Sequence, residues 1–210
     1  MYIYGAQIQA APGKAGAAAA KVTEIRDVIY AETGQTGWAW GVVAGAPVGS
    51  YLLSTRLDGS AALVDLQMKL AQSEAYQSLA AGVGDLWAGP VETNFSRVVG
   101  TAGEVGEAPQ PFISVTQATV AGGNMGAAMA WASKVLEHVS KVSGMGGLLV
   151  AAAAGNPFDI GWIFGSESGA AGDAAADAIQ ADADYLALID EGSGLFVDGS
   201  AQRVTLMQLP

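Results

Sequence analysis

The order of apolar and polar residues predicts a series of secondary-structure elements in the first half of the chain. Residues 2–10 are extended in character and end at a Pro-Gly turn, and residues 15–33 place apolar side chains three and four positions apart, as on one helical face. Residues 36–46 and 51–57 predict a hairpin, residues 60–81 a second helix with Ser60 as its N-cap, and residues 91–99 a last strand. The predicted order is β-α-β-β-α-β.

The second half repeats this order. Its predicted elements are a strand at 112–120, a helix at 125–143, a hairpin at 148–154 and 160–167, a helix at 174–190 and a strand at 203–209. Residues 4–59 align without a gap with residues 114–169, 110 positions later, and most of the shared residues are turn-forming glycine or proline. We therefore expect one repeat at 1–100, a linker at 101–111 and a second repeat at 112–210.

Each repeat has the element order of a ferredoxin-like α+β unit, a four-stranded antiparallel sheet with both helices on one face. The other face of such a sheet is left uncovered, and an apolar sheet face has to be buried against another layer. The equivalent face of the sister repeat can supply that cover. We therefore predict two tandem repeats that form a pseudo-dimeric α/β barrel within one chain.

Composition narrows the possible function classes. The chain has 51% hydrophobic and 14% charged residues and no cysteine, which argues against disorder, disulfides and thiolate sites. Its formal net charge of −11 repels phosphate backbones and anionic membrane surfaces, so nucleic acid and membrane are expected not to be partners. The first residues, 1–4, have no basic region of a signal peptide, and the longest apolar run of the sequence, 148–154, is too short to cross a bilayer. A soluble, cytoplasmic protein is the simplest expectation.

Several aromatic and polar side chains on the first-half strands are candidates for a ligand site. Trp38 and Trp40 alternate onto one face of their strand, a pattern typical of a core as well as of a ligand platform. The second half has Leu148 and Val150 instead, which suggests the hypothesis that only the first half holds a pocket. The predicted lining is Tyr4, Trp38, Trp40, Tyr51, Asn94 and Arg97. Arg97 would need an anionic partner if it pointed inward, or would reach solvent at the rim.

His138 is the single histidine and lies on the apolar stripe of its predicted helix, which favours a structural role. No metal site is expected, because a tetrahedral zinc site needs more nitrogen or sulfur ligands than the chain supplies. The acidic residues between 173 and 191 indicate a solvated helix face. The glycines at 144–147 lack the lysine and the following helix of a phosphate loop.

Three short stretches resemble the dimeric α/β-barrel superfamily, which includes the antibiotic-biosynthesis monooxygenases, EthD-like proteins and the NIPSNAP family. They are Pro12-Gly13-Lys14 after the opening strand, Ser73-Glu74-Ala75-Tyr76-Gln77, and Gly89-Pro90-Val91. In the gap-free alignment the second half departs from them, with Gly122, Asn124 and Leu186 in place of Pro12, Lys14 and Tyr76.

The resemblance implies a function class. The monooxygenases of this group oxidise aromatic polyketide-type substrates without metal or flavin, using Trp, Asn, Tyr and Arg side chains, and Trp38, Trp40, Asn94 and Arg97 are of those types. Chlorite-dismutase-like relatives use one axial histidine, which would make His138 a haem ligand. We expect a cofactor-free binder or oxygenase for an apolar or aromatic small molecule. A structural or assembly protein, a haem protein that uses His138, and a homo-oligomer of pseudo-dimeric chains are the alternatives left open.

Overall fold

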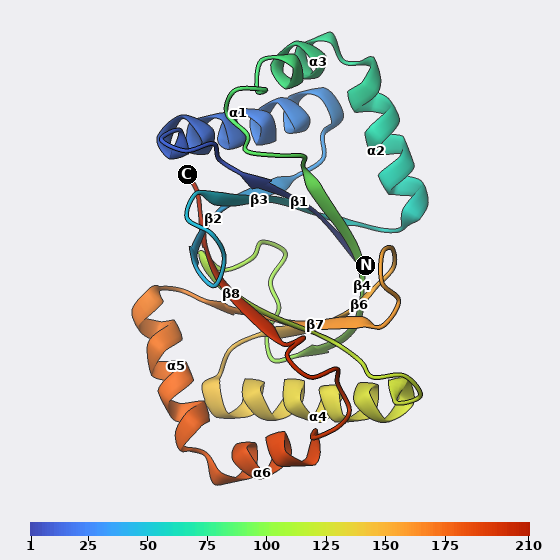
Figure 1. Cartoon of the computed structure of the whole chain (residues 1–210), viewed down its shortest axis with the longest axis vertical. Helices are drawn as coiled ribbons and strands as arrows, with labels where there is room; N and C mark the ends of the chain where they lie inside the picture. Colours follow the sequence, from blue (N-terminus) through green and yellow to red (C-terminus); the bar gives the residue numbers. More distant parts are fainter. The chain divides into compact units, whose positions relative to one another are not determined.

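The computed structural model describes residues 1–210 and contains the predicted series of elements twice (Figure 1). The first series is β1 (Tyr2–Gln9), α1 (Ala15–Thr33), β2 (Gly37–Ala44), β3 (Ser50–Leu57), α2 (Ser60–Gln72), α3 (Glu74–Ala81) and β4 (Glu92–Ala102). The second is β5 (Phe112–Thr119), α4 (Met125–Ser143), β6 (Gly147–Ala152), β7 (Asp159–Ser166), α5 (Gly169–Ala181), α6 (Ala183–Glu191) and β8 (Gln202–Gln208). The α+β class is therefore confirmed.

Residue contacts divide the chain into two units at other places than the sequence suggested. The first unit is Met1–Ser96 with Met207–Pro210, and the second is Arg97–Leu206, so the boundaries fall inside β4 and inside β8. The expected linker 101–111 begins within β4, which continues to Ala102. This part of β4 packs closely against the second unit's core: a Cβ added at Gly100 would lie 3.4 Å from Leu136 and 3.5 Å from Leu149.

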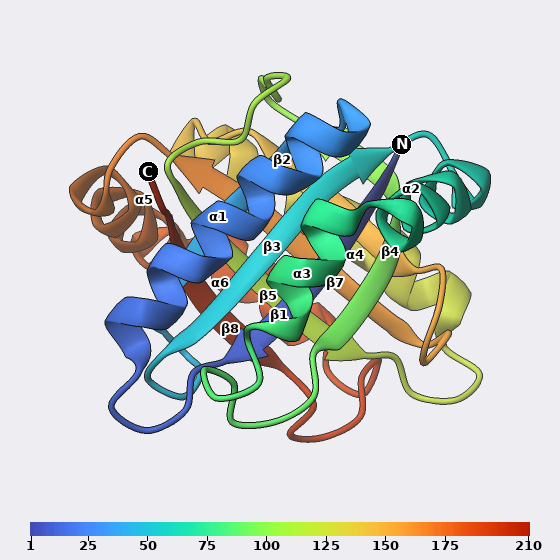
Figure 2. The same ribbon diagram turned by 90° about the horizontal axis from the view of Figure 1, so that it is seen from above.

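Three strands of each unit form an antiparallel sheet, and the second strand of the hairpin lies in the middle. In the first unit β3 lies between β1 and β2, with Tyr2 opposite Leu57 and Gly37 opposite Thr55. In the second unit β7 lies between β5 and β6 in the same way. Viewed from above, α1 lies along β3 on the helix-bearing face of the first sheet (Figure 2). The ferredoxin-like order is present in each unit, and the pseudo-dimeric barrel stays a prediction.

The second predicted helix of each unit is two helices. Ser73 adopts extended backbone angles between α2 and α3, and its side chain accepts a hydrogen bond from the Tyr76 backbone N–H at 3.1 Å. Asp182 does the same between α5 and α6, accepting from the Tyr185 N–H at 2.7 Å. Each residue is an N-cap that ends one helix and begins the next. Ser60, the predicted N-cap of the earlier helix, is its first helical residue, and Gly59 takes the cap position.

The gap-free alignment of the halves is wrong beyond the hairpin turn. Gly37 pairs with Thr55 in the first sheet, and Gly147, 110 residues after Gly37, pairs with Phe164 in the second. Phe164 follows Thr55 by 109 residues, one fewer than the alignment requires. The turn between β6 and β7 has therefore lost one residue relative to its counterpart. As a result Tyr76 corresponds to Tyr185, the residue capped by Asp182, and not to Leu186.

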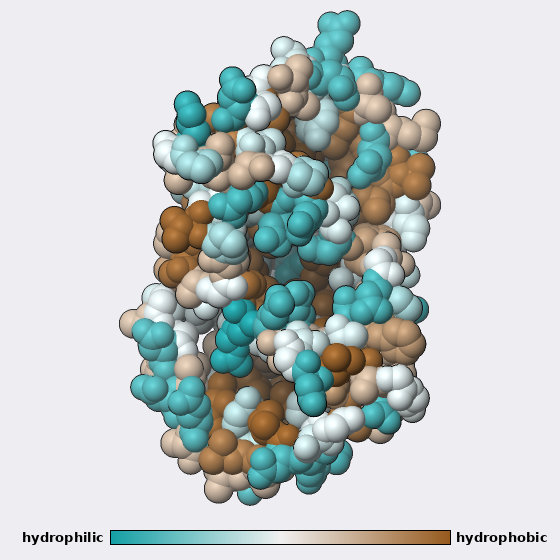
Figure 3. Space-filling view, viewed as in Figure 1, coloured by the Kyte–Doolittle hydropathy of each residue, from teal (hydrophilic) through white to brown (hydrophobic).

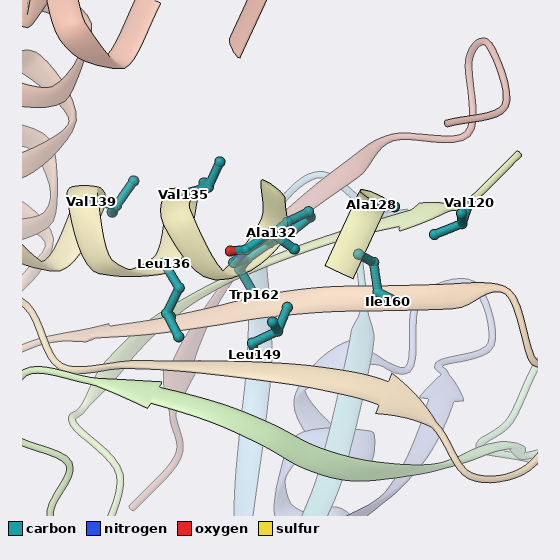
Figure 4. Close-up of a cluster of buried hydrophobic side chains, with 9 residues drawn as sticks. All are labelled: Val120, Ala128, Ala132, Val135, Leu136, Val139, Leu149, Ile160 and Trp162. Carbon is teal, nitrogen blue, oxygen red and sulfur yellow. The ribbon is translucent and has the colours of Figure 1, made fainter. Parts of the chain in front are cut away.

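The core of each unit lies between its sheet and its helices. In the second unit, Ala132 and Leu136 on α4 face Leu149 and Trp162 on the sheet, while Val135 and Val139 point to the other side of the helix (Figure 4). In the first unit the corresponding cluster has fewer buried members, which are Ile8, Ala10, Ala18, Val22, Ala39 and Tyr51. This difference in filling determines where a cavity remains.

The surface carries scattered apolar side chains. Hydrophilic and apolar residues alternate over the face seen in Figure 3. Examples of exposed apolar residues are Val64 and Met68 on α2, which are 55% and 56% exposed. None of the helices combines the length and the apolar character that a membrane span requires.

Candidate functional site

A cavity of about 260 Å³ lies in the first unit between the sheet and its three helices. The sheet forms its floor, α1 and α2 form two walls, and α3 contributes Tyr76 and Gln77. Most of its lining is apolar. The lining residues are Tyr4, Ala6, Ile25, Arg26, Ile29, Gly37, Leu53, Ser54, Thr55, Leu66, Gln67, Leu70, Ala71, Tyr76 and Gln77.

Two tyrosines supply the principal polar groups of the cavity. Gln67 donates a long hydrogen bond of 3.4 Å to the Tyr4 hydroxyl, and the Tyr76 hydroxyl has no protein partner. Burial raises the pKa of Tyr4, a rise that the Gln67 hydrogen bond opposes and the neighbouring Tyr76 increases. Burial alone raises the pKa of Tyr76. Both phenols are therefore protonated at neutral pH and can donate a hydrogen bond to a ligand.

The remaining polar side chains of the lining are engaged with the protein. The Thr55 hydroxyl donates to the Thr36 carbonyl at 2.7 Å and accepts from Gln35 at 2.9 Å. Arg26 donates to Asp27 at 2.8 Å and to the Pro210 carbonyl at 3.0 Å. No unpaired charge therefore faces the cavity, and its chemistry suits a neutral ligand.

The second unit fills the corresponding space with aromatic rings. Trp162 and Phe164 occupy the sheet positions of Leu53 and Thr55. Trp162 is 6% exposed, donates from Nε1 to the Ala132 carbonyl at 3.0 Å, and meets Trp131 edge-on at 5.8 Å between ring centroids. The Phe164 ring packs so closely that a side chain at Gly147 would lie 2.4 Å from it. The two repeats therefore differ in the layer where a ligand could enter.

The six predicted lining residues do not lie together. Tyr4 lines the cavity, and Tyr51 lies on the same sheet face farther along, where its hydroxyl donates to the Ala15 carbonyl at 2.7 Å. Trp38 and Trp40 lie on the opposite face, as the alternation with Gly37 and Ala39 requires.

The residues on that opposite face make local contacts within their unit. Trp40 is 1% exposed and donates to the Ser54 hydroxyl at 2.9 Å. Arg56 stacks on the Trp38 ring at 5.6 Å. Asn94 is exposed and lies beside Gly5, where an added side chain would approach its amide to 2.7 Å. Arg97 is also exposed.

His138 lies half-buried between α4 and α6 in the second unit. Its Nε2 lies 2.8 Å from Asp182 Oδ1, and its ring stacks with Tyr185 at 6.5 Å. The Tyr185 backbone N–H and then the His138 hydrogen bond lower the pKa of Asp182. The groove beside it has charged walls formed by Lys134, Glu137, Lys141, Asp184 and Glu191. A haem needs a largely apolar slot, so the charged walls of this groove do not fit one.

Sequence reasoning missed Leu53, Gln67 and Tyr76 as cavity residues. Tyr76 was visible in the stretch 73–77 that carries the family resemblance, but its place facing Tyr4 depends on the break at Ser73. Leu53 could have been noticed only by comparison with Trp162, and the one-residue shift hid that comparison.

Known proteins resemble this chain in structure but not in sequence. No protein-family model matches the sequence, and no curated protein sequence matches it. Solved structures do match over the whole chain. A candidate monooxygenase from Fusobacterium nucleatum has a TM-score of 0.73 at 8% identity, covering 100% of this chain and 92% of that one.

Two further structures match almost the whole chain. An anthrone oxidase-like protein has a TM-score of 0.68 at 16% identity, covering 100% of this chain and 91% of that one. A haem-degrading enzyme from Listeria monocytogenes has a TM-score of 0.55 at 8% identity, covering 99% of both chains. At sequence identities this low, the structural similarity establishes the fold but not the activity. The chain has the fold of these solved structures, as the family resemblance in its sequence predicted.

Proposed function

We propose that the first unit binds a small apolar or aromatic molecule in the cavity between its sheet and its helices. The observation that carries this proposal is the difference between the repeats: about 260 Å³ stays open in the first unit, where Trp162 and Phe164 fill the second. A cavity of roughly 150 Å³ holds benzene, and drug-sized ligands use roughly 300 Å³ or more. The expected ligand therefore has one or two rings.

The polar groups of the cavity define how such a ligand would be oriented. The Tyr4 and Tyr76 hydroxyls can donate to an oxygen on the ligand, and the apolar lining from Ile29, Leu53 and Leu70 receives its rings. Because Arg26 is already paired, a carboxylate on the ligand would lack a counter-charge there. We infer that the ligand is neutral and carries at least one hydrogen-bond acceptor.

The reaction class we propose is oxygenation without metal or flavin, in which molecular oxygen oxidises a ring CH2 group of the substrate to a carbonyl and the second oxygen atom leaves as water. It rests on the sequence resemblance and on fold neighbours described as a monooxygenase and as an anthrone oxidase-like protein. Tyr4 and Tyr76 would donate hydrogen bonds to an oxygen attached to the substrate's ring, and so hold and polarise the substrate. Oxygen uptake by the protein with a ligand that it binds tests the catalytic part separately from binding.

The binding proposal is tested with 2-naphthol, a neutral two-ring probe, by titration calorimetry. We expect one site per chain. Leu53→Trp places in the cavity the residue that fills the second unit, and should abolish binding. Val64→Trp, on the exposed side of the same unit, is the matched control and should bind as the wild type does. Binding that survives Leu53→Trp would exclude this cavity as the site.

The two alternative functions have their own tests. A scaffold function would be favoured by failure of 2-naphthol and related neutral ring compounds to bind at all. A haem function would be favoured by a Soret band in the visible spectrum of the purified protein that disappears in His138→Ala. The charged walls of the groove beside His138 argue against the second result.

A further inference from the structure

We propose that Glu32, acting through Ser73, is a positioning residue that holds α3 and its Tyr76 against the cavity. The inference rests on the proposed function where it concerns ligand affinity, and on the contacts of α3 where it concerns position. Glu32 lies in the last turn of α1, is exposed, and does not line the cavity. Its effect on the site therefore has to pass through another residue.

Ser73 makes the connection with two hydrogen bonds. Its hydroxyl donates to Glu32 Oε2 at 2.7 Å and accepts from the Tyr76 backbone N–H at 3.1 Å. Ser73 is 7% exposed, so its hydroxyl is largely shielded from water. A hydrogen bond to a charged acceptor is among the stronger polar contacts in proteins. The Glu32 carboxylate also lies at the N-terminal end of α3, where a negative charge is favourable.

The hydrophobic contacts of α3 are too few to position it alone. Its span, Glu74–Ala81, contains no buried residue, and Tyr76 and Leu79 are only half-buried. A helix of this length has little stability of its own in water. The polar link between α1 and α3 therefore has a disproportionate share in fixing the Tyr76 ring.

The second unit contains an independent version of the same link. Asp182 caps α6 in the position of Ser73, and its carboxylate contacts His138, which lies one turn before the α4 position that corresponds to Glu32. The donor and acceptor are exchanged, because the cap supplies the charge and the first helix supplies the N–H. Two different residue pairs make the same connection, which indicates that the connection itself matters.

The test combines amide hydrogen exchange with 2-naphthol calorimetry on the full chain. Glu32→Ala should speed exchange in residues 74–81 and weaken 2-naphthol binding by about two- to tenfold, the ratio expected for one lost hydrogen bond. Glu32→Gln keeps an acceptor for Ser73 but loses the charge, so both readouts should lie between those of the wild type and those of Glu32→Ala. Glu24→Ala is the matched control, since Glu24 is an exposed α1 carboxylate whose partner is Lys21. It should change neither readout.

The outcomes separate this inference from the proposed function. Unchanged exchange in residues 74–81 of Glu32→Ala would overturn the inference, and so would faster exchange with wild-type affinity for 2-naphthol. If wild-type protein fails to bind 2-naphthol while Glu32→Ala still speeds exchange in α3, the proposed function falls and the positioning of α3 by Glu32 is supported.

Discussion

Replacing Trp162 by leucine should destabilise the second unit by about 3 to 4 kcal/mol. The change gives the second sheet the residue that the first sheet has at Leu53. It removes a side chain that is 6% exposed, packs edge-on against Trp131 and donates to the Ala132 carbonyl. It should leave a void where the first unit has a cavity.

The magnitude follows from these contacts. A buried tryptophan removes roughly 200 Å² or more of apolar surface from water, about 5 kcal/mol at 25 cal/mol per Å², and a buried leucine retains about 2 kcal/mol of that. The indole hydrogen bond adds about 1 kcal/mol. Partial collapse of the α4 side chains onto the void would lower the total.

Urea denaturation of the wild type, Trp162→Leu and Leu53→Trp measures the free energy of unfolding. The reciprocal variant Leu53→Trp places its ring in an existing cavity, so it should cost less than about 1 kcal/mol. Equal losses for the two variants would refute the claim that the repeats differ in filling. So would a loss below about 1 kcal/mol for Trp162→Leu, because the ring would then contribute little to the core.

Three further predictions concern single side chains. Tyr76→Phe should weaken 2-naphthol binding by about two- to tenfold in calorimetry and leave naphthalene binding unchanged, because only the first probe has an oxygen to accept its hydrogen bond. Trp40→Phe removes the hydrogen bond to Ser54 and part of a fully buried ring, so chemical denaturation should show a loss of about 2 kcal/mol. The pKa of Asp182 is lowered in the folded state, chiefly by the Tyr185 N–H, so its contribution is present above the unfolded pKa and lost as pH falls through the folded value. Asp182→Asn keeps a good N-cap, so its melting temperature should be lower than that of the wild type near neutrality, and the difference should vanish in acid; a constant difference at all pH values would contradict the assignment.

The helices α1 and α4 were predictable from the sequence to the residue. Their apolar faces have a clear period, and both end at a glycine with φ of 72°, a conformation that favours glycine, at Gly34 and Gly144. The breaks at Ser73 and Asp182 were not predictable in this way, because helical residues continue on both sides and the cap competes with the helix only locally. Once the break is known, the serine three residues before Tyr76 is a readable signal.

The residues that line the candidate site were harder to predict from the sequence. Which strand residues share a face is set by alternation along each strand, but which of them meet a helix is set by register and packing. Tyr4 and Trp38 are both aromatic and lie on neighbouring parts of one sheet, yet only Tyr4 faces α2 and α3. The hypothesis of unequal halves is supported by Trp162, through a residue that the gap-free alignment had paired with Leu52 and not with Leu53.

The last four residues belong to the first unit, and this has a practical consequence for protein engineering. The Leu209 N–H donates to the Ala39 carbonyl at 2.8 Å, and the Pro210 carbonyl accepts from Arg26, whose side chain also borders the cavity. Trimming residues 207–210 would remove the two carbonyl acceptors of that guanidinium and leave it with Asp27. The trimmed protein would be expected to bind carboxylates more tightly. A ligand screen run on it would therefore report the wrong chemical preference.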